Sequence, residues 1–405
     1  MIRSACGLAA VTLAVGLGVS PPSIAAAAHP EAPEAGAIKL GYVELADDPR
    51  YANRGAYSGI VFTDLGRPYQ RSQVALEDAR AIGQVTGIEF SMEKSTAESD
   101  DKLAQRTSGW VTNDDIHFVL ADLPAAALKG LARRFADRPV MFINISAPDD
   151  SLRGADCASN VAHTYPSEAM LSDALMQYLV AKGWLQILVL QGPAPEDAAM
   201  VVALHRSARK FHANIVETRP FLLTSDPRNR EQTNIVLMTG GLRYDVVYVA
   251  DSSGEFGRYV LYETSLPRPV VGTAGLVPTA WSWSWDRDAA VQLQHRYERV
   301  SPPRRMNGAD WAAWEAVKAV TQAVMRTRSI AFDTVKAFLL SDKLSLDTVK
   351  GNPGSFRAWD HQLRAPVLLT TANAVIERAP LPQYLHQTNV LDTLGIDAPE
   401  TACRF

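Results

Sequence analysis

The chain has 405 residues, with 40 Lys and Arg against 44 Asp and Glu, which gives a formal net charge of −4 at pH 7. This slightly acidic balance does not indicate a nucleic-acid-binding protein. The length is sufficient for two domains of ordinary size. The Cys and His residues are scattered without the spacing of a zinc site, so we expect no metal ion.

Residues 1–28 have the pattern of a secretory signal peptide. Arg3 supplies the positive charge, residues 8–19 form a short apolar run, and the alanines at 26–28 suit a cleavage site. The apolar run is too short to serve as a membrane span, and no later segment approaches one. We therefore expect a soluble chain that is exported to the periplasm and begins near His29.

The cysteines predict one disulfide bond. Removal of the signal peptide takes away Cys6 and leaves Cys157 and Cys403. In an oxidising compartment, two remaining cysteines indicate a single bridge. The position of Cys403 near the C-terminus favours such a link, and two buried free thiols are the alternative.

Strand and helix patterns alternate along the first part of the chain. Continuous apolar strands that alternate with amphipathic helices favour parallel sheets covered on both faces. The expected strands are 37–45, 88–94, 116–122 and 139–145, and the expected helices are 69–85, 100–111 and 125–136.

The same alternation starts again after Pro166. The expected helices are 167–183, 195–212 and 228–241, and the expected strands are 185–191, 214–221, 244–251 and 269–274. A mostly helical part follows, with helices at 288–300, 310–327 and 333–341, and residues 356–363 and 367–379 look extended. Two α/β units in series predict a bilobal binding protein, whose ligand lies at the carboxyl ends of the parallel strands.

Several stretches resemble the type I periplasmic binding proteins that bind branched-chain amino acids. They are NISAPDDSLRG, TYPSEAMLSDALMQYL, YDVVYVAD, ADWAAWEAVKAVTQAV and GNPGSFRAWDHQLRAPVLL. The resemblance implies an α/β type I periplasmic binding fold with two doubly wound parallel-sheet lobes, a hinge and an interlobe cleft. The implied first lobe is 37–160 and 277–352, the second is 161–276 and 353–398, and the protein is expected to be a monomer.

A narrower resemblance points to binding proteins associated with quinoprotein alcohol dehydrogenases that use pyrroloquinoline quinone (PQQ). It rests on LADDPRYANRGAY, GRPYQRS, ILVLQGP, SFRAWDHQLRAPVLL and LDTLGIDAPETACRF. It implies a substrate-binding component of an ABC transporter, with a membrane permease as its partner. PQQ is then the expected bound ligand, although no cofactor is required.

The sequence departs from amino-acid binders at the ligand loops. Those proteins hold the α-carboxylate with small hydroxyl residues and backbone amides from two loops of the first lobe. Here the first loop, ADLPAAALKG, has no Ser or Thr, and the second keeps only Ser146, followed by Ala147. Ala274 stands where an acid faces the ligand ammonium in that family. Because an ammonium buried without a counter-charge is costly, the sequence argues against an ordinary amino acid.

Aromatic and basic residues gather in the segments expected to border the cleft, most densely in AWSWSWDR at 280–287. Arg binds carboxylates with two parallel hydrogen bonds and Trp stacks on flat rings, which suits a planar tricarboxylate such as PQQ. Core packing of the tryptophans is the alternative, and we expect one or two of the three in the cleft. The predicted ligand-binding residues are Arg50, Tyr51, Ser146, Ala147, Tyr165, Asp251, Trp281, Trp283, Arg287 and Trp311.

No catalytic motif is apparent in the chain. It contains neither a GxSxG elbow nor a P-loop, and Asp360 and His361 are adjacent in sequence, which rarely makes a catalytic pair. We therefore expect no enzyme and no catalytic residue, but a binding protein that closes around a small ligand. The alternatives are a periplasmic sensor or scaffold of the same fold, or a binder of another small organic acid, amino acid or alcohol-oxidation product.

Overall fold

The computed structural model describes residues 36–51, 66–300 and 304–405, and these residues form one compact unit. The predicted signal peptide and its cleavage site lie outside the described residues. Within the described part of the chain, no helix is both long and apolar enough to span a membrane.

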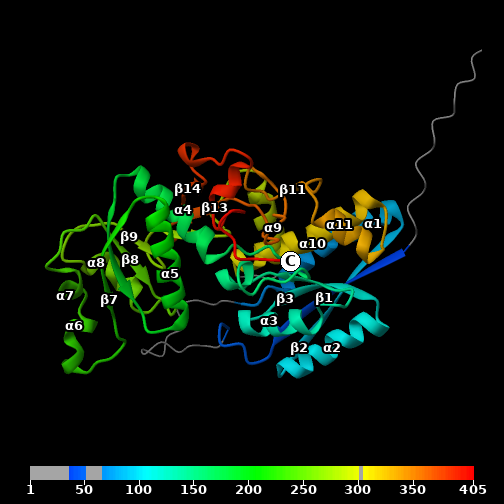
Figure 1. Cartoon of the computed structure of the whole chain (residues 1–405), viewed down its shortest axis with the longest axis horizontal. Helices are drawn as coiled ribbons and strands as arrows, with labels where there is room; N and C mark the ends of the chain where they lie inside the picture. The colour runs from blue at the N-terminus through cyan, green and yellow to red at the C-terminus, as the bar shows by residue number, and fades with distance from the viewer. Residues whose placement is uncertain (1–35, 52–65, 301–303) are drawn as a thin grey trace, which may run out of the picture. The chain divides into compact units, whose positions relative to one another are not determined.

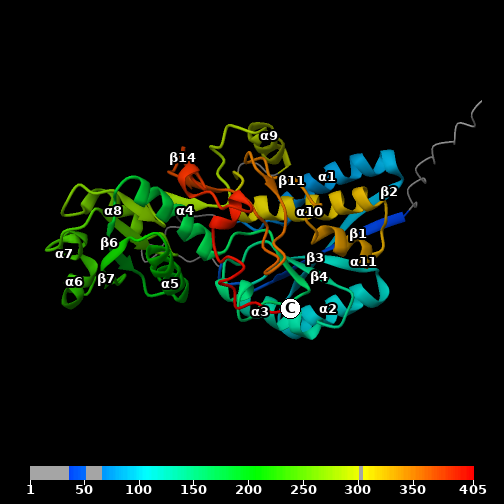
Figure 2. The same ribbon diagram turned by 45° about the horizontal axis from the view of Figure 1, so that its top comes forward.

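The first lobe is built on a parallel sheet with the strand order β2-β1-β3-β4-β5. Figures 1 and 2 show α1, α10 and α11 on one face of this sheet and α2 and α3 on the other. The strands are β1 (Gly36–Leu45), β2 (Ile88–Ala97), β3 (Ile116–Asp122), β4 (Met141–Asn144) and β5 (Val161–His163). The helices are α1 (Tyr69–Thr86), α2 (Asp100–Asn113), α3 (Ala125–Arg134), α9 (Ala290–Val300), α10 (Gly308–Thr327) and α11 (Phe332–Leu339).

The second lobe has a parallel sheet with the order β7-β6-β8-β9. Alternate residues of its strands face two separate cores, one under α4 and α5 and one under α7 and α8. The strands are β6 (Gln186–Gln191), β7 (Asn214–Pro220), β8 (Val246–Ala250) and β9 (Val270–Gly272). The helices are α4 (Glu168–Ala181), α5 (Pro195–Lys210), α6 (Arg230–Thr233), α7 (Ile235–Thr239) and α8 (Gly257–Glu263).

Both parallel sheets confirm the predicted α/β class. The segment 367–379 is extended as expected and forms β13 (Val367–Thr370) and β14 (Val375–Ala379). The strand β10 (Val277–Thr279) was not expected, and it completes a small antiparallel sheet with the order β10-β13-β14. Leu368 of β13 packs into the core of the first lobe, whereas Val367 and Leu369 pack into that of the second. One strand therefore joins the two cores.

The short elements complete the fold. The pair β11 (Leu346–Asp347) and β12 (Pro353–Gly354) is antiparallel, and four 3₁₀ turns occur in the described residues. The expected helix at 228–241 is divided by Asn234, whose side chain caps the next turn. The turns are η1 (Asp150–Arg153), η2 (Pro227–Asn229), η3 (Pro382–Tyr384) and η4 (Val390–Thr393).

Local signals set the start and end of α4 as the sequence predicts. The Ser167 hydroxyl accepts a hydrogen bond from the Met170 amide at 3.2 Å, which satisfies one of the free amides at a helix N-terminus. After the last turn, Gly183 adopts a φ of 73°, a conformation that glycine tolerates best. This capping fixes the point where the chain enters the second lobe.

The predicted disulfide is confirmed. Cys157, which lies between β4 and β5, is bonded to Cys403 across a Cα–Cα distance of 5.6 Å. Cys403 is buried, so the bridge lies inside the folded structure rather than on a free tail.

Candidate functional site

Acidic side chains converge at the carboxyl edge of the first sheet. Glu44 of β1 and Asp122 of β3 are register partners in a parallel pair, so their side chains point to the same face of the sheet. Both are buried. Tyr42, two residues before Glu44, donates its hydroxyl to Asp122 Oδ2 at 3.1 Å. This is the edge at which open α/β sheets bind ligands.

Asp122 is the centre of this cluster. Its Oδ1 accepts the Tyr51 hydroxyl at 2.8 Å and lies 3.4 Å from Arg50 Nη2. Burial raises the pKa of Asp122, and the Arg50 charge opposes that rise. Burial also raises the pKa of both Tyr42 and Tyr51, so the phenols stay protonated donors. The buried acid thus orients two tyrosines and one arginine.

Arg50 presents a guanidinium at this edge. Asp48 binds it through Nη2 at 2.6 Å and Nε at 3.1 Å, a two-pronged pair. Nη1 donates to Ser146 Oγ at 2.9 Å. About a fifth of the Arg50 side chain (21%) remains accessible, whereas Asp48 and Asp122 are fully covered. A solute at this edge would therefore meet Arg50 and Ser146 before it met the acids.

Two further cations balance the acids. Arg67 Nη1 lies 3.6 Å from Glu44 Oε2, and Lys94 Nζ lies 2.7 Å from Glu44 Oε1. The Arg67 guanidinium also lies over the Tyr51 ring, 4.6 Å from its centre. Among the residues that the structure describes, the cluster therefore has as many positive as negative groups, namely Arg50, Arg67 and Lys94 with Glu44, Asp48 and Asp122.

Tyr165 joins this cluster to the start of the second lobe. Burial raises the pKa of the Tyr165 phenol to about 12. The charge of Glu168 adds to this rise and the charge of Arg50 opposes it, so the phenol lies within electrostatic reach of Glu168 and Arg50. Burial, together with Asp150 and Asp149, raises the pKa of Glu168 to about 8. Glu168 is half-buried, and its carboxylate makes no hydrogen bond or ion pair with the residues that the structure describes.

The Trp-rich segment packs mainly into the first lobe. Trp281 is 3% exposed and Trp311 is fully buried, both in the core that also holds α1 and α10. Trp311 Nε1 donates to the Thr348 carbonyl at 3.2 Å. Trp283 is partly exposed and carries Arg305 over its ring at 3.4 Å. Arg287 is exposed on the protein surface. The rings thus serve packing, and Trp283 alone of these three is accessible.

Two other predicted residues are occupied by local contacts. The Asp251 carboxylate accepts hydrogen bonds from amides of its own loop at 2.8 to 3.1 Å, including that of Gly257 at the start of α8. Ala147 is buried; its amide donates to Asn144 and its carbonyl accepts from Asn144 and Arg153. Both residues shape their loops and leave no polar group directed at a solute.

Sequence reasoning missed the acids at the strand ends. Glu44 and Asp122 stand at the carboxyl ends of two largely apolar strands, which is an unusual position for a buried charge and was the available signal. Glu168 follows a helix cap and looks like an ordinary first-turn acid. Arg50, Tyr51, Ser146 and Tyr165 are predicted residues that the structure does bring to this region.

A separate cavity of about 320 Å³ lies in the second lobe. It contains none of the residues predicted from the sequence, and most of its lining is apolar. The lining residues are Leu222, Leu223, Thr224, Thr233, Ile235, Glu255, Phe256, Tyr259 and Glu263. We place the candidate site at the first sheet instead, because that is where partly accessible charged groups converge.

Known proteins with the same architecture are numerous. A solute-binding protein from R. palustris, in complex with benzoate, superposes with a TM-score of 0.63 at 13% sequence identity. The alignment covers 91% of this chain and 100% of the R. palustris chain. A leucine-, isoleucine-, valine-, threonine- and alanine-binding protein from Brucella ovis has a TM-score of 0.65 at 14% identity, with 85% and 92% covered. The fold is therefore that of the type I periplasmic binding proteins.

Sequence comparison agrees over part of the chain. Residues 63–254 match the family described as periplasmic binding protein, just under half of the chain. The Leu/Ile/Val/Thr-binding protein of Salmonella typhimurium is 27% identical over 120 residues, which are 29% of this chain. The match spans only 33% of the length of that relative. These matches support the type I periplasmic binding protein family that the sequence resembles.

Proposed function

We propose that this chain is a periplasmic solute-binding protein that delivers a small zwitterionic solute of the amino-acid type to an ABC transporter. The observation that carries the proposal is that Tyr165 lies within electrostatic reach of two groups of opposite charge, Arg50 and Glu168. Arg50 with Ser146 offers donors to a carboxylate, and Glu168 offers a counter-charge to an ammonium. The binding role, rather than catalysis, is supported by the fold and by the family match.

The acid at Glu168 changes the argument against amino acids. Ala274, the expected position of the ammonium partner, packs against the core under α8 and carries no charge. An unpaired carboxylate at the start of α4 supplies the missing counter-charge from another element. The Salmonella typhimurium relative and the Brucella ovis structure are both described as proteins that bind leucine, isoleucine, valine and threonine.

PQQ is the less favoured ligand. A planar tricarboxylate needs surplus positive charge, whereas the described cations at the strand ends are already balanced by Glu44, Asp48 and Asp122. The stacking platform expected in AWSWSWDR is largely buried. The resemblance to PQQ-associated binding proteins still motivates its inclusion in any ligand panel.

A ligand panel tests the proposal directly. Isothermal titration calorimetry should compare leucine, threonine, benzoate, a free alcohol and PQQ against the purified mature chain. We expect saturable binding of at least one amino acid. The variant Glu168→Gln should weaken it about ten- to a hundredfold, the loss typical of one charge-assisted contact. Binding of benzoate, which has no ammonium, should not depend on Glu168.

Two results would reverse the assignment. Tight binding of PQQ with no response to amino acids would restore the ligand that the narrower resemblance implies. Saturable binding that is unchanged in both Arg50→Met and Glu168→Gln would move the site away from Tyr165. A sensor of the same fold would also bind ligand, and uptake assays in cells lacking the chain separate transport from sensing.

A further inference from the structure

We propose that the C-terminal segment, residues 390–405, is a covalently anchored tether across the hinge that limits how far the two lobes separate. The tether is independent of the ligand's identity. It is defined by contacts at three places along the segment, which are described in turn.

The segment begins fixed to the second lobe. The buried Asp173 carboxylate of α4 accepts the Gly395 amide at 2.7 Å. Lys210, at the end of α5, donates to the carbonyls of Thr393 and Gly395 at 2.8 and 3.0 Å, and to Asp173 at 2.8 Å. An ion pair between the half-buried Lys210 and the buried Asp173 thus holds this end through backbone groups of the segment.

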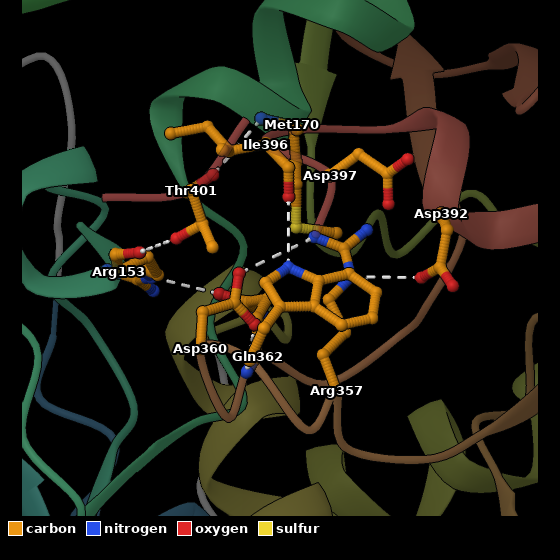
Figure 3. Close-up of polar contacts among 12 residues, drawn as sticks. Arg153, Met170, Arg357, Asp360, Gln362, Asp392, Ile396, Asp397 and Thr401 are labelled. Atoms are coloured by element: carbon orange, nitrogen blue, oxygen red, sulfur yellow. Dashed lines mark hydrogen bonds and ion pairs between the residues drawn. The ribbon is translucent and has the colours of Figure 1, made fainter. Parts of the chain in front are cut away.

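The middle of the segment is bound to the chain that returns to β13. Figure 3 shows Arg357 directed toward Asp392, with Asp360 on its other side. Arg357 Nε lies 3.0 Å from Asp392 Oδ1, and its Nη2 donates to the Leu394 carbonyl at 2.7 Å. Trp359 Nε1 donates to the Ile396 carbonyl at 3.2 Å. Because Arg357 is almost fully buried, these contacts are shielded from solvent.

The segment ends fixed to the first lobe. Cys403 is bonded to Cys157 in the loop between β4 and β5. Thr401 Oγ1 donates to the carbonyl of Arg153 in the same loop at 3.4 Å, and Phe405 stacks on His361 with ring centres 4.2 Å apart. Arg153 in turn binds Gln362 Oε1 at 2.9 Å, a contact visible in Figure 3. The first lobe is therefore held both covalently and by a buried network.

The length of the segment between its two anchors limits how far the lobes can separate. Five residues separate the Gly395 anchor from Thr401, and a fully extended chain spans at most about 20 Å over these six Cα–Cα steps. Hinge opening that carries α4 and α5 away from the loop at Cys157 must therefore stretch or detach the segment. Ligand binding in hinged proteins favours the closed state, so a tether that disfavours wide opening would also raise apparent affinity.

Small-angle X-ray scattering of the ligand-free protein tests the tether. We expect a larger radius of gyration after reduction of the disulfide and in the double variant Cys157→Ser, Cys403→Ser. Lys210→Met releases the other end without touching the disulfide and should also expand the protein. Lys182→Met, an exposed lysine just after α4, is the matched control and should leave the scattering unchanged. Circular dichroism at the same temperature confirms that each variant is folded.

Unchanged scattering in the folded, reduced protein, with both thiols titrated, would overturn the tether. Expansion in the disulfide variant but not in Lys210→Met would place the restraint at the disulfide alone and overturn the role of the second-lobe anchor. A second measurement, of ligand affinity, rests on the proposed function. The disulfide variant and Lys210→Met should each bind an amino acid about two- to tenfold more weakly than the parent. Expansion without any amino-acid binding would keep the tether and reject the proposed function.

Discussion

Glu44 and Asp122 lie opposite each other on neighbouring parallel strands, and both side chains are buried on the same face of the first sheet. Two carboxylates so placed repel each other unless cations compensate them. Arg50 and Arg67 approach Asp122, and Arg67 with Lys94 approaches Glu44. The edge of the sheet is thus a buried network in which each charge depends on its neighbours.

The first prediction concerns the stability of that network. Asp122→Asn removes the charge that pairs with Arg50 and one acceptor of the tyrosine hydroxyls, so the free energy of unfolding should fall by about 2–4 kcal/mol. Urea denaturation measures the change. Asp101→Asn, on an exposed side chain of α2, is the control and should stay within about 0.5 kcal/mol of the parent. If Asp122→Asn were as stable as the parent, the Asp122 carboxylate would not stabilise the network of charges at this edge of the sheet.

The second prediction concerns protons released on binding. Below pH 8 the carboxyl of Glu168 is mostly protonated, because burial and the acids Asp149 and Asp150 raise its pKa to about 8 and the Arg153 charge only partly opposes them. A bound ammonium favours the charged form, so binding at pH 7 should release up to one proton. Affinity should therefore rise as the pH increases from 7 toward 8.

Calorimetry in two buffers of different ionisation enthalpy measures that release. In Glu168→Gln the proton release should vanish and the affinity should no longer change with pH. Glu89→Gln, an exposed acid on β2, should behave as the parent. Amino-acid binding without proton uptake or release at pH 7 would show that Glu168 does not face the ammonium.

The alternation of strands and helices was the most predictable part of the structure. Buried parallel strands such as β3 and β8 are short continuous apolar runs, and few other elements produce that pattern. The disulfide followed from the count of cysteines left after export. The pairing of β10 with β13 was not predicted, because β10 is short and its partner lies far along the sequence. Local pattern carries no information about such pairing.

The site was predictable only in part, because burial cannot be derived from residue type. The predicted residues Arg50 and Tyr165 lie in the same region of the structure, whereas the tryptophans Trp281 and Trp285 of AWSWSWDR pack in the core around α10. The local sequence does not distinguish a tryptophan on the surface from one in a core. Asp122 was overlooked because a terminal strand acid reads as solvated, whereas three donors hold it under the sheet edge.

The third prediction separates packing from recognition among the tryptophans. Trp311→Phe should lower the free energy of unfolding by about 1–3 kcal/mol, because it leaves a void in the core and removes the hydrogen bond to the Thr348 carbonyl. Ligand affinity should change by less than about twofold. Trp283→Phe, at a partly exposed ring, should change stability much less. Loss of affinity in Trp311→Phe with unchanged stability would contradict the packing role.

The last prediction rests on a buried acid in the first lobe. Glu315 of α10 has no exposed surface, and neither carboxylate oxygen has a hydrogen-bond partner among the described residues. Burial raises its pKa to about 7, and the neighbouring charges of Lys318 and Lys350 only partly oppose that rise. Lys350 itself is occupied by the carbonyls of Ala280 and Pro366.

The raised pKa fixes the direction of the pH dependence. The folded protein keeps the Glu315 proton up to about pH 7, whereas the unfolded chain loses it near 4.5, so this group's contribution to stability is complete below pH 4.5 and is lost by about pH 7. Relative to the parent, Glu315→Gln should therefore gain stability between pH 4.5 and 7, by about 3 kcal/mol in all. Urea unfolding at several pH values measures the difference, with the exposed Glu98→Gln as control. A stability difference that stays constant from pH 4.5 to 7 would show that Glu315 ionises in the folded protein as it does in water.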